Sequence, residues 1–112
     1  MRRGEVWWAN LPPPSGSGPG LRRPVVVVQA NAFNDSMIST VIVLTITSNL
    51  ALADAPGNVR IKQSDSGLKR ASVINVSQLV TLDRTLLSAR VKALPSNVLI
   101  RINDGLKLSL GI

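Results

Sequence analysis

The sequence predicts a small α+β domain, with a strongly curved, mostly antiparallel β-sheet and one C-terminal helix. Two observations support this fold class. Short runs rich in Val, Ile and Thr, separated by turn-forming residues, recur as far as residue 94. From Pro95, apolar residues then follow helical spacing, with Gly111 at the end: Val98, Leu99, Ile102, Leu106 and Leu110.

The first strands are predicted from β-branched and aromatic residues. Glu5–Leu11 contains valine and two tryptophans and is stopped by Pro12. The runs Pro24–Gln29 and Thr40–Ile46 are continuous and apolar, which is typical of central strands covered on both faces. Turn formers fill Asn31–Ser39 between them.

Later elements are shorter. Apolar and basic residues alternate over Val59–Gln63, which predicts a half-exposed strand with a basic outer face. Two further strands are expected at Ser72–Val76 and Leu79–Leu82, and a brief one at Val91–Leu94. Asp83 is expected to cap a short helix that runs through Ser88.

Size and composition predict one compact domain over residues 1–112. Hydrophobic residues make up 45% of the chain and charged residues 17%, so further burial in an oligomer would stabilise so small a core. The apolar runs fall far short of the ~20 residues of a membrane span. We therefore expect a soluble, cytoplasmic protein with no membrane partner.

Charge points to a polyanion partner. Thirteen Lys and Arg residues against six Asp and Glu give a net charge of +7. The basic residues are scattered rather than gathered in one tail, as at Arg22 and Arg23, Arg60 and Lys62, and Lys69 and Arg70, which indicates a folded basic surface.

The residue inventory excludes most catalytic templates. The chain has no histidine and no cysteine, so a Ser-His-Asp triad, a Cys-His pair and an ordinary zinc site are all ruled out. The six acidic residues are dispersed and form no carboxylate pair. The glycines of GSGPG precede a strand rather than a helix, so they do not form a dinucleotide-binding loop.

That inventory still permits RNA cleavage. The 2′-hydroxyl of RNA supplies its own nucleophile, so a protein must splay the strand and stabilise the negative charge that develops on phosphorus. Arginine suits this task because its planar guanidinium binds two phosphate oxygens at once. Arg23 lies where a Gly/Ser/Pro-rich loop, Ser15–Gly20, gives way to a predicted buried strand.

Four segments together resemble one family. RGEVWWANL, GSGPGLRRPVVVVQAN, TVIVLTITSN and SVINVSQLVTLDRTLL, in this order and spacing, are similar to the MazF/PemK toxin endoribonucleases over nearly the whole chain. The resemblance implies an SH3-like, CcdB-like curved antiparallel β-barrel with a C-terminal helix, and a homodimer. It also implies cleavage of single-stranded mRNA without a metal or other cofactor. The expected products carry a 2′,3′-cyclic phosphate and a 5′-hydroxyl, and a cognate antitoxin would cover the RNA groove with an acidic segment.

The resemblance also implies roles for single residues. The family's catalytic arginine falls on Arg23, which would stabilise the phosphorane-like transition state, and its catalytic threonine falls on Thr47, which would hold the scissile phosphate in line. The remaining expected RNA contacts are Gly16, Ser17, Arg22, Ser48, Lys69, Arg70 and Gln78.

Two other classes of function stay open at this point. Proteins of the implied fold also poison DNA gyrase through the C-terminal helix, without nuclease chemistry. A non-catalytic, SH3-like RNA-binding module would fit the charge equally well. Such a module usually exposes several aromatic residues for stacking, and this chain has only Trp7, Trp8 and Phe33.

Overall fold

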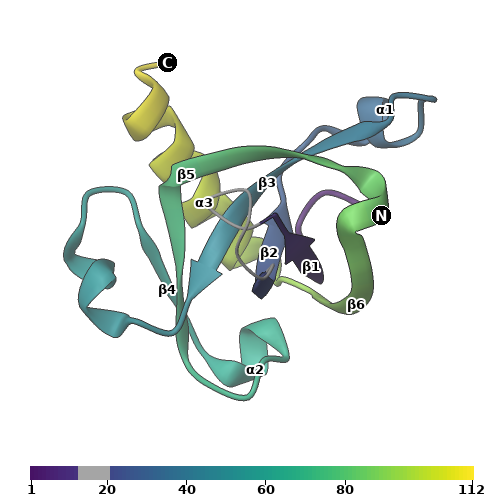
Figure 1. The fold of residues 1–112 in the computed structure, drawn as a ribbon. Coiled ribbons are helices and arrows are strands. Elements are labelled where there is room, and N and C mark those ends of the chain that lie inside the picture. The colour runs from purple at the N-terminus through teal and green to yellow at the C-terminus, as the bar shows by residue number, and fades with distance from the viewer. Residues whose placement is uncertain (13–20) are drawn as a thin grey trace.

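The computed structural model describes residues 1–12 and 21–112, and within these residues the chain forms one curled, six-stranded antiparallel half-barrel with a C-terminal helix (Figure 1). The strand order is β4-β5-β3-β2-β1-β6. The strands are β1 Glu5–Leu11, β2 Leu21–Val27, β3 Thr40–Thr47, β4 Val59–Ile61, β5 Ser72–Asp83 and β6 Leu87–Ala93. The helices are α1 Asn31–Asn34, α2 Gln63–Ser66 and α3 Ser96–Leu110, and the 3₁₀ turns are η1 Leu50–Asp54 and η2 Arg84–Leu86.

The predicted fold class is confirmed, and β1 and α3 lie where the sequence places them. Helix α3 ends at Gly111, whose φ of 70° is the left-handed conformation of a helix C-cap. The expected short helix after Asp83 is only the turn η2, although the Asp83 side chain does cap it by accepting from the Thr85 N–H at 3.0 Å. No helix of residues 1–12 and 21–112 is long and apolar enough to cross a membrane.

Strand β5 corrects one prediction. The segments expected as two strands form a single one, with a break in its pairing to β3. Thr45 pairs with Asn75 and Leu44 with Leu79, so the residues from 76 to 78 have no partner on β3. Such a bulge bends a strand, and Figure 1 shows β5 turning sharply along its length.

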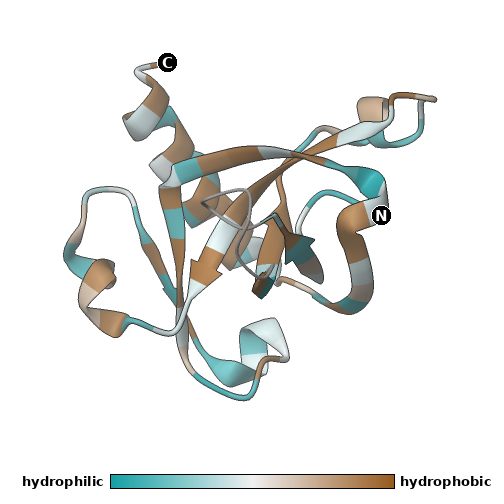
Figure 2. Cartoon of the chain, in the orientation of Figure 1, coloured by the Kyte–Doolittle hydropathy of each residue, from teal (hydrophilic) through white to brown (hydrophobic). Residues whose placement is uncertain are grey.

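The strands β2 and β3 bury side chains on both faces, as their continuous apolar runs predict, and β1 does so as well. Figure 2 shows hydrophobic residues along β2 and β3. One cluster lies between the sheet and α3, where it includes Val26, Leu44 and Ile102. The other lies on the opposite face and includes Val25, Val27 and Val43. The adjacent Trp7 and Trp8 divide between them: Trp7 packs against the second cluster and Trp8 against the first.

A close backbone approach holds α3 against the sheet. A Cβ atom added to Gly105 would lie 2.2 Å from the carbonyl oxygen of Gly57, so only glycine fits at this point of the helix. Gly57 itself has a φ of 80° in the loop before β4. The helix therefore contains a residue of low helical propensity because the loop passes directly over it.

Gly105→Ala is expected to destabilise the protein by about 1–3 kcal/mol, because the clash with Gly57 outweighs alanine's better helical propensity. Urea unfolding followed by circular dichroism measures this change. The neighbouring, exposed Asp104→Ala serves as the control and should change stability little. A Gly105→Ala variant as stable as the wild type would contradict the close packing.

Candidate functional site

The pairing of β2 and β3 ends early. Strand β2 pairs with β1 back to Leu21, but its pairs with β3 begin only at Val25, opposite Thr45. The Gly4 N–H donates to the Val27 carbonyl at 2.7 Å, so the Val27 backbone faces β1. Backbone groups alternate sides along a strand, and the Pro24 backbone therefore faces β3. Proline has no N–H to donate, so the ladder to β3 stops at this position.

Arg23 and Thr47 lie beyond this last pair. Arg23 comes two residues before Val25 and Thr47 two residues after Thr45, so both occupy the face that carries Val25 and Thr45. Arg23 is exposed and Thr47 half-buried. The Thr47 hydroxyl oxygen accepts from the Asn49 N–H at 3.1 Å, which fixes its orientation at the strand end.

Gln78 reaches the same face from β5. The Thr45 hydroxyl donates to the Gln78 side-chain oxygen at 2.6 Å. Gln78 is free to make this contact because it lies in the bulge of β5, where no ladder partner on β3 constrains it. Gln78 therefore contacts Thr45, on the face that Arg23 and Thr47 share by register.

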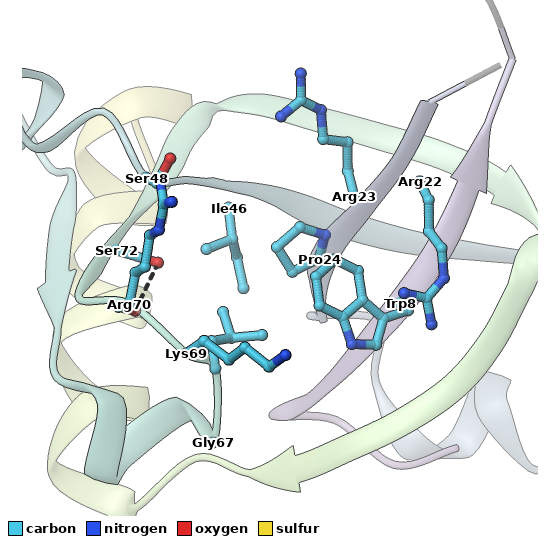
Figure 3. Close-up of a pocket in the computed structure, with 11 residues that line it drawn as sticks. Trp8, Arg22, Arg23, Pro24, Ile46, Ser48, Gly67, Lys69, Arg70 and Ser72 are labelled. Carbon is cyan, nitrogen blue, oxygen red and sulfur yellow. Dashed lines mark hydrogen bonds between the residues drawn. The ribbon is translucent and has the colours of Figure 1, made fainter. Parts of the chain in front are cut away.

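The opposite face carries a cavity of about 550 Å³. It is lined by Trp8, Arg22, Arg23, Pro24, Ile46, Ser48, Gly67, Leu68, Lys69, Arg70 and Ser72. Apolar groups come from three adjacent strands and from the segment after α2, and four cations stand around them (Figure 3). None of the described residues that line it is acidic.

The predicted contact residues divide between these two surfaces. Arg22, Ser48, Lys69 and Arg70 line the cavity, whereas Thr47 and Gln78 do not. Arg23 stands between the two surfaces, because it lines the cavity edge while Figure 3 shows its side chain pointing away. The predictions for Gly16 and Ser17 lie outside the described residues.

The sequence predicted no site role for six of the residues that line the cavity, and Trp8 is one of them. Trp8 lines the wall, and the Arg22 guanidinium lies 4.5 Å from its ring centroid, a cation–π distance. The alternation of side chains between the two faces of a strand was the sequence feature that could have placed Trp8. Trp8 pairs with Pro24, so these two side chains share the face of Ile46 rather than the face of Arg23.

A buried carboxylate secures the start of β1. Glu5 is 8% exposed and accepts hydrogen bonds from the Arg2 N–H at 2.7 Å and the Trp7 indole at 3.2 Å, and from the Arg90 guanidinium. Burial raises the pKa of the Glu5 carboxyl, but these hydrogen bonds and the charge of Arg90 outweigh burial and leave the pKa below its ordinary value. Glu5 therefore holds Trp7 and β6 in place as an anion.

Among the described residues, none of the four cations that line the cavity forms an ion pair with a carboxylate. In the part of the chain that the structure describes, the ion pairs are Arg2–Asp35 and Arg90–Glu5. Arg22, Arg23, Lys69 and Arg70 take part in neither. Within the same residues, no three potential Asp or Glu metal ligands gather at one place.

Residues 1–12 and 21–112 form a curled antiparallel half-barrel, and those that line its cavity include four cations and no acid. Such a small protein is suited to a polyanionic ligand. The family model described as PemK-like, MazF-like toxin of type II toxin-antitoxin system matches residues 2–110. The chain belongs to this toxin family.

Curated relatives agree with this assignment. The chain is 46% identical over 107 residues to endoribonuclease MazF2 of Mycobacterium bovis, covering 96% of this chain and 94% of the relative. It is 33% identical over 112 residues to endoribonuclease EndoA of Bacillus subtilis, covering 100% and 96%.

Solved structures show the same fold. An endoribonuclease in complex with its cognate antitoxin from Mycobacterial species superposes with a TM-score of 0.82 at 24% identity, covering 100% of this chain and 96% of that chain. The Mycobacterium tuberculosis toxin MazF-mt6 superposes with a TM-score of 0.80 at 16% identity, covering 96% and 97%.

The lowered pKa of Glu5 makes a prediction about acid stability. A depressed folded-state pKa contributes stability above the pKa of the unfolded chain, about 4.3 for glutamate, and loses it as the pH falls through the folded-state value. Glu5→Gln should therefore lower stability by about 1 kcal/mol at neutral pH and flatten the acid side of the profile. Urea midpoints measured from pH 3 to pH 7 test this, and parallel profiles for the two proteins would refute it.

Proposed function

We propose that this chain is an endoribonuclease toxin that cleaves single-stranded mRNA through attack of the RNA's own 2′-hydroxyl, without a metal ion. The coarse activity rests on the family match and on relatives named as endoribonucleases. The finer chemistry rests on the residues available. The chain has no histidine or cysteine, and the resemblance to the family implies that an arginine and a threonine act together with the substrate's own hydroxyl.

The observation that supports this chemistry is the placement of Arg23 and Thr47 on one face, beyond the last β2–β3 pair. A phosphodiester lying across this face meets the Arg23 guanidinium, which stabilises the charge on the pentacoordinate phosphorus. The Thr47 hydroxyl, oriented by its bond to the Asn49 N–H, donates to a phosphate oxygen and holds it in line.

The step conserves all its atoms. The 2′-oxygen bonds to phosphorus and the bond from phosphorus to the 5′-oxygen breaks. The 2′-hydroxyl loses its proton to water, and the departing 5′-oxygen takes up a proton from water. The products are a 2′,3′-cyclic phosphate and a 5′-hydroxyl, and DNA, which has no 2′-hydroxyl, remains uncut.

Two protein partners belong to the proposal. The first is a cognate antitoxin whose acidic segment covers the cations of the site. The second is another copy of this chain, docked through an apolar hollow of about 390 Å³. This hollow is lined by Val28, Gln29, Ala30, Phe33, Ile38, Thr40, Ile42, Leu79, Thr81, Leu106 and Leu110. Phe33 and Leu110 are 57% and 52% exposed, and a second copy would remove them from water.

Arg23→Ala should lower the cleavage rate by about 10²–10³-fold because it removes the transition-state cation, and Thr47→Ala should lower it less. The measurement is cleavage of a long unstructured RNA in EDTA, with the chemistry of the ends mapped. Arg101→Ala is a matched control, since Arg101 is an exposed arginine on α3 that does not line the cavity.

Cyclic-phosphate ends that disappear in Arg23→Ala but persist in Arg101→Ala would support the proposal. Intact RNA after incubation with folded, dimeric wild-type protein would contradict the proposed cleavage. The remaining candidate functions would then be gyrase poisoning and non-catalytic RNA binding.

The dimer is tested by two leucines of one helix. Leu110 lines the hollow and Leu108, which is 63% exposed, does not. Leu110→Asp should weaken self-association at least about 10-fold, because a carboxylate is costly in an apolar interface, whereas Leu108→Asp should not. Sedimentation equilibrium measures both variants. A monomeric wild type, or equal effects of the two substitutions, would argue against this interface.

A further inference from the structure

The cavity and the Arg23–Thr47 face are two sides of the same strand ends. Ile46 and Thr47 are consecutive in β3, so one side chain points into the cavity and the next lies on the face proposed for cleavage. A strand of RNA whose phosphate lies against Thr47 therefore has the cavity within the reach of a neighbouring nucleotide.

The cavity wall is built for a flat, apolar group. Trp8 is half-buried, and Arg22 occupies one face of its ring at 4.5 Å from the centroid. Pro24, Ile46 and Leu68 provide the other apolar surfaces. The volume of about 550 Å³ lies in the range of clefts that bind small organic groups.

The rim is built for phosphate. Arg23 lies at the edge on β2, while Lys69 and Arg70 approach from the segment between α2 and β5 (Figure 3). A base in the cavity would thus have cations near the phosphates on either side of it. A flat group flanked by two anions is a nucleotide unit of a single strand.

We propose that this cavity is a base-stacking subsite, which takes one unpaired base of the substrate RNA next to the scissile phosphate and stacks it against Trp8. Arg22 fixes the indole from its other side. The inference rests on the proposed function for its substrate. It adds that Trp8, a residue outside the proposed reaction, binds the base at one position beside the scissile phosphate.

An acidic peptide is the alternative ligand for this cavity. The presence of Trp8 in the cavity wall favours RNA over such a peptide. Stacking on an indole rewards a planar ring, and every base offers one. An extended acidic peptide would bind the cations through its carboxylates. It would gain little binding energy from contact with the Trp8–Arg22 pair. The subsite is therefore assigned to RNA, and a peptide is kept as an outcome of the test.

The test scans an RNA strand for the base that Trp8 binds. The probe is a short single-stranded RNA carrying the mapped cleavage sequence, made non-cleavable by a 2′-deoxy nucleotide at the scissile position. If no cleavage is found, an unstructured strand of mixed sequence replaces it. Abasic sites are introduced one at a time, and affinity is measured by fluorescence anisotropy at constant salt for the wild type, Trp8→Leu and Trp8→Phe.

The expected result is one position at which an abasic site weakens wild-type binding roughly 10-fold, as for the loss of one base–aromatic stack. Trp8→Leu should weaken binding of the intact strand by a similar factor and respond no further to that abasic site. Trp8→Phe, which keeps a ring, should restore most of the affinity. Arg101→Ala should show the wild-type pattern, and urea unfolding should confirm that each variant is folded.

Three results would overturn the subsite. The first is an abasic scan that affects wild type and Trp8→Leu equally at every position. The second is unchanged RNA affinity in Trp8→Leu with weakened binding of a peptide of alternating glutamate and leucine. The third is a wild type that binds no RNA. A wild type that binds with the expected abasic pattern but cuts nothing would keep the subsite and reject the cleavage, so the two failures are distinguishable.

Discussion

The missing N–H of Pro24 is the constraint on which the site depends. Its backbone faces β3, so the hydrogen-bond ladder between β2 and β3 ends at the next residue, while the pairing of β2 with β1 continues to Leu21. The strand ends are therefore rigid on one side and open on the other. This opening leaves Arg23 exposed on a fixed backbone and makes room for the cavity beside Ile46. A residue with an N–H here could extend the sheet and close the site.

The parts of the fold that the sequence predicts are those in which the local pattern of apolar residues directly reflects burial. The apolar spacing after Pro95 predicts α3, and the valine run predicts the buried half of β2, because each pattern reports burial directly. The beginning of β2 at Leu21 is not visible in this way, since that residue is a strand residue only through its pairing with β1. The continuous β5 is hidden for the same reason: its bulge is defined by the partner residues on β3.

The site, too, has parts that the sequence predicts and parts that depend on how distant segments pack together. The resemblance and the composition predict a cationic surface with Arg23 and Thr47 on adjacent strands, and the register places both on one face. Which loop returns beside them depends on tertiary packing, so the approach of Lys69 and the wall formed by Trp8 required the structure. The two faces suit different tasks. One offers a cation and a hydroxyl to a phosphate, and the other offers an aromatic pocket to a base.

The most direct test of this account is the structure of the protein bound to a single-stranded RNA with a 2′-deoxy nucleotide at the scissile position. The account predicts the scissile phosphate against the guanidinium of Arg23 and the hydroxyl of Thr47, with an adjacent base stacked on Trp8 in the cavity. A strand bound elsewhere on the sheet, or a scissile phosphate out of reach of Arg23, would contradict it.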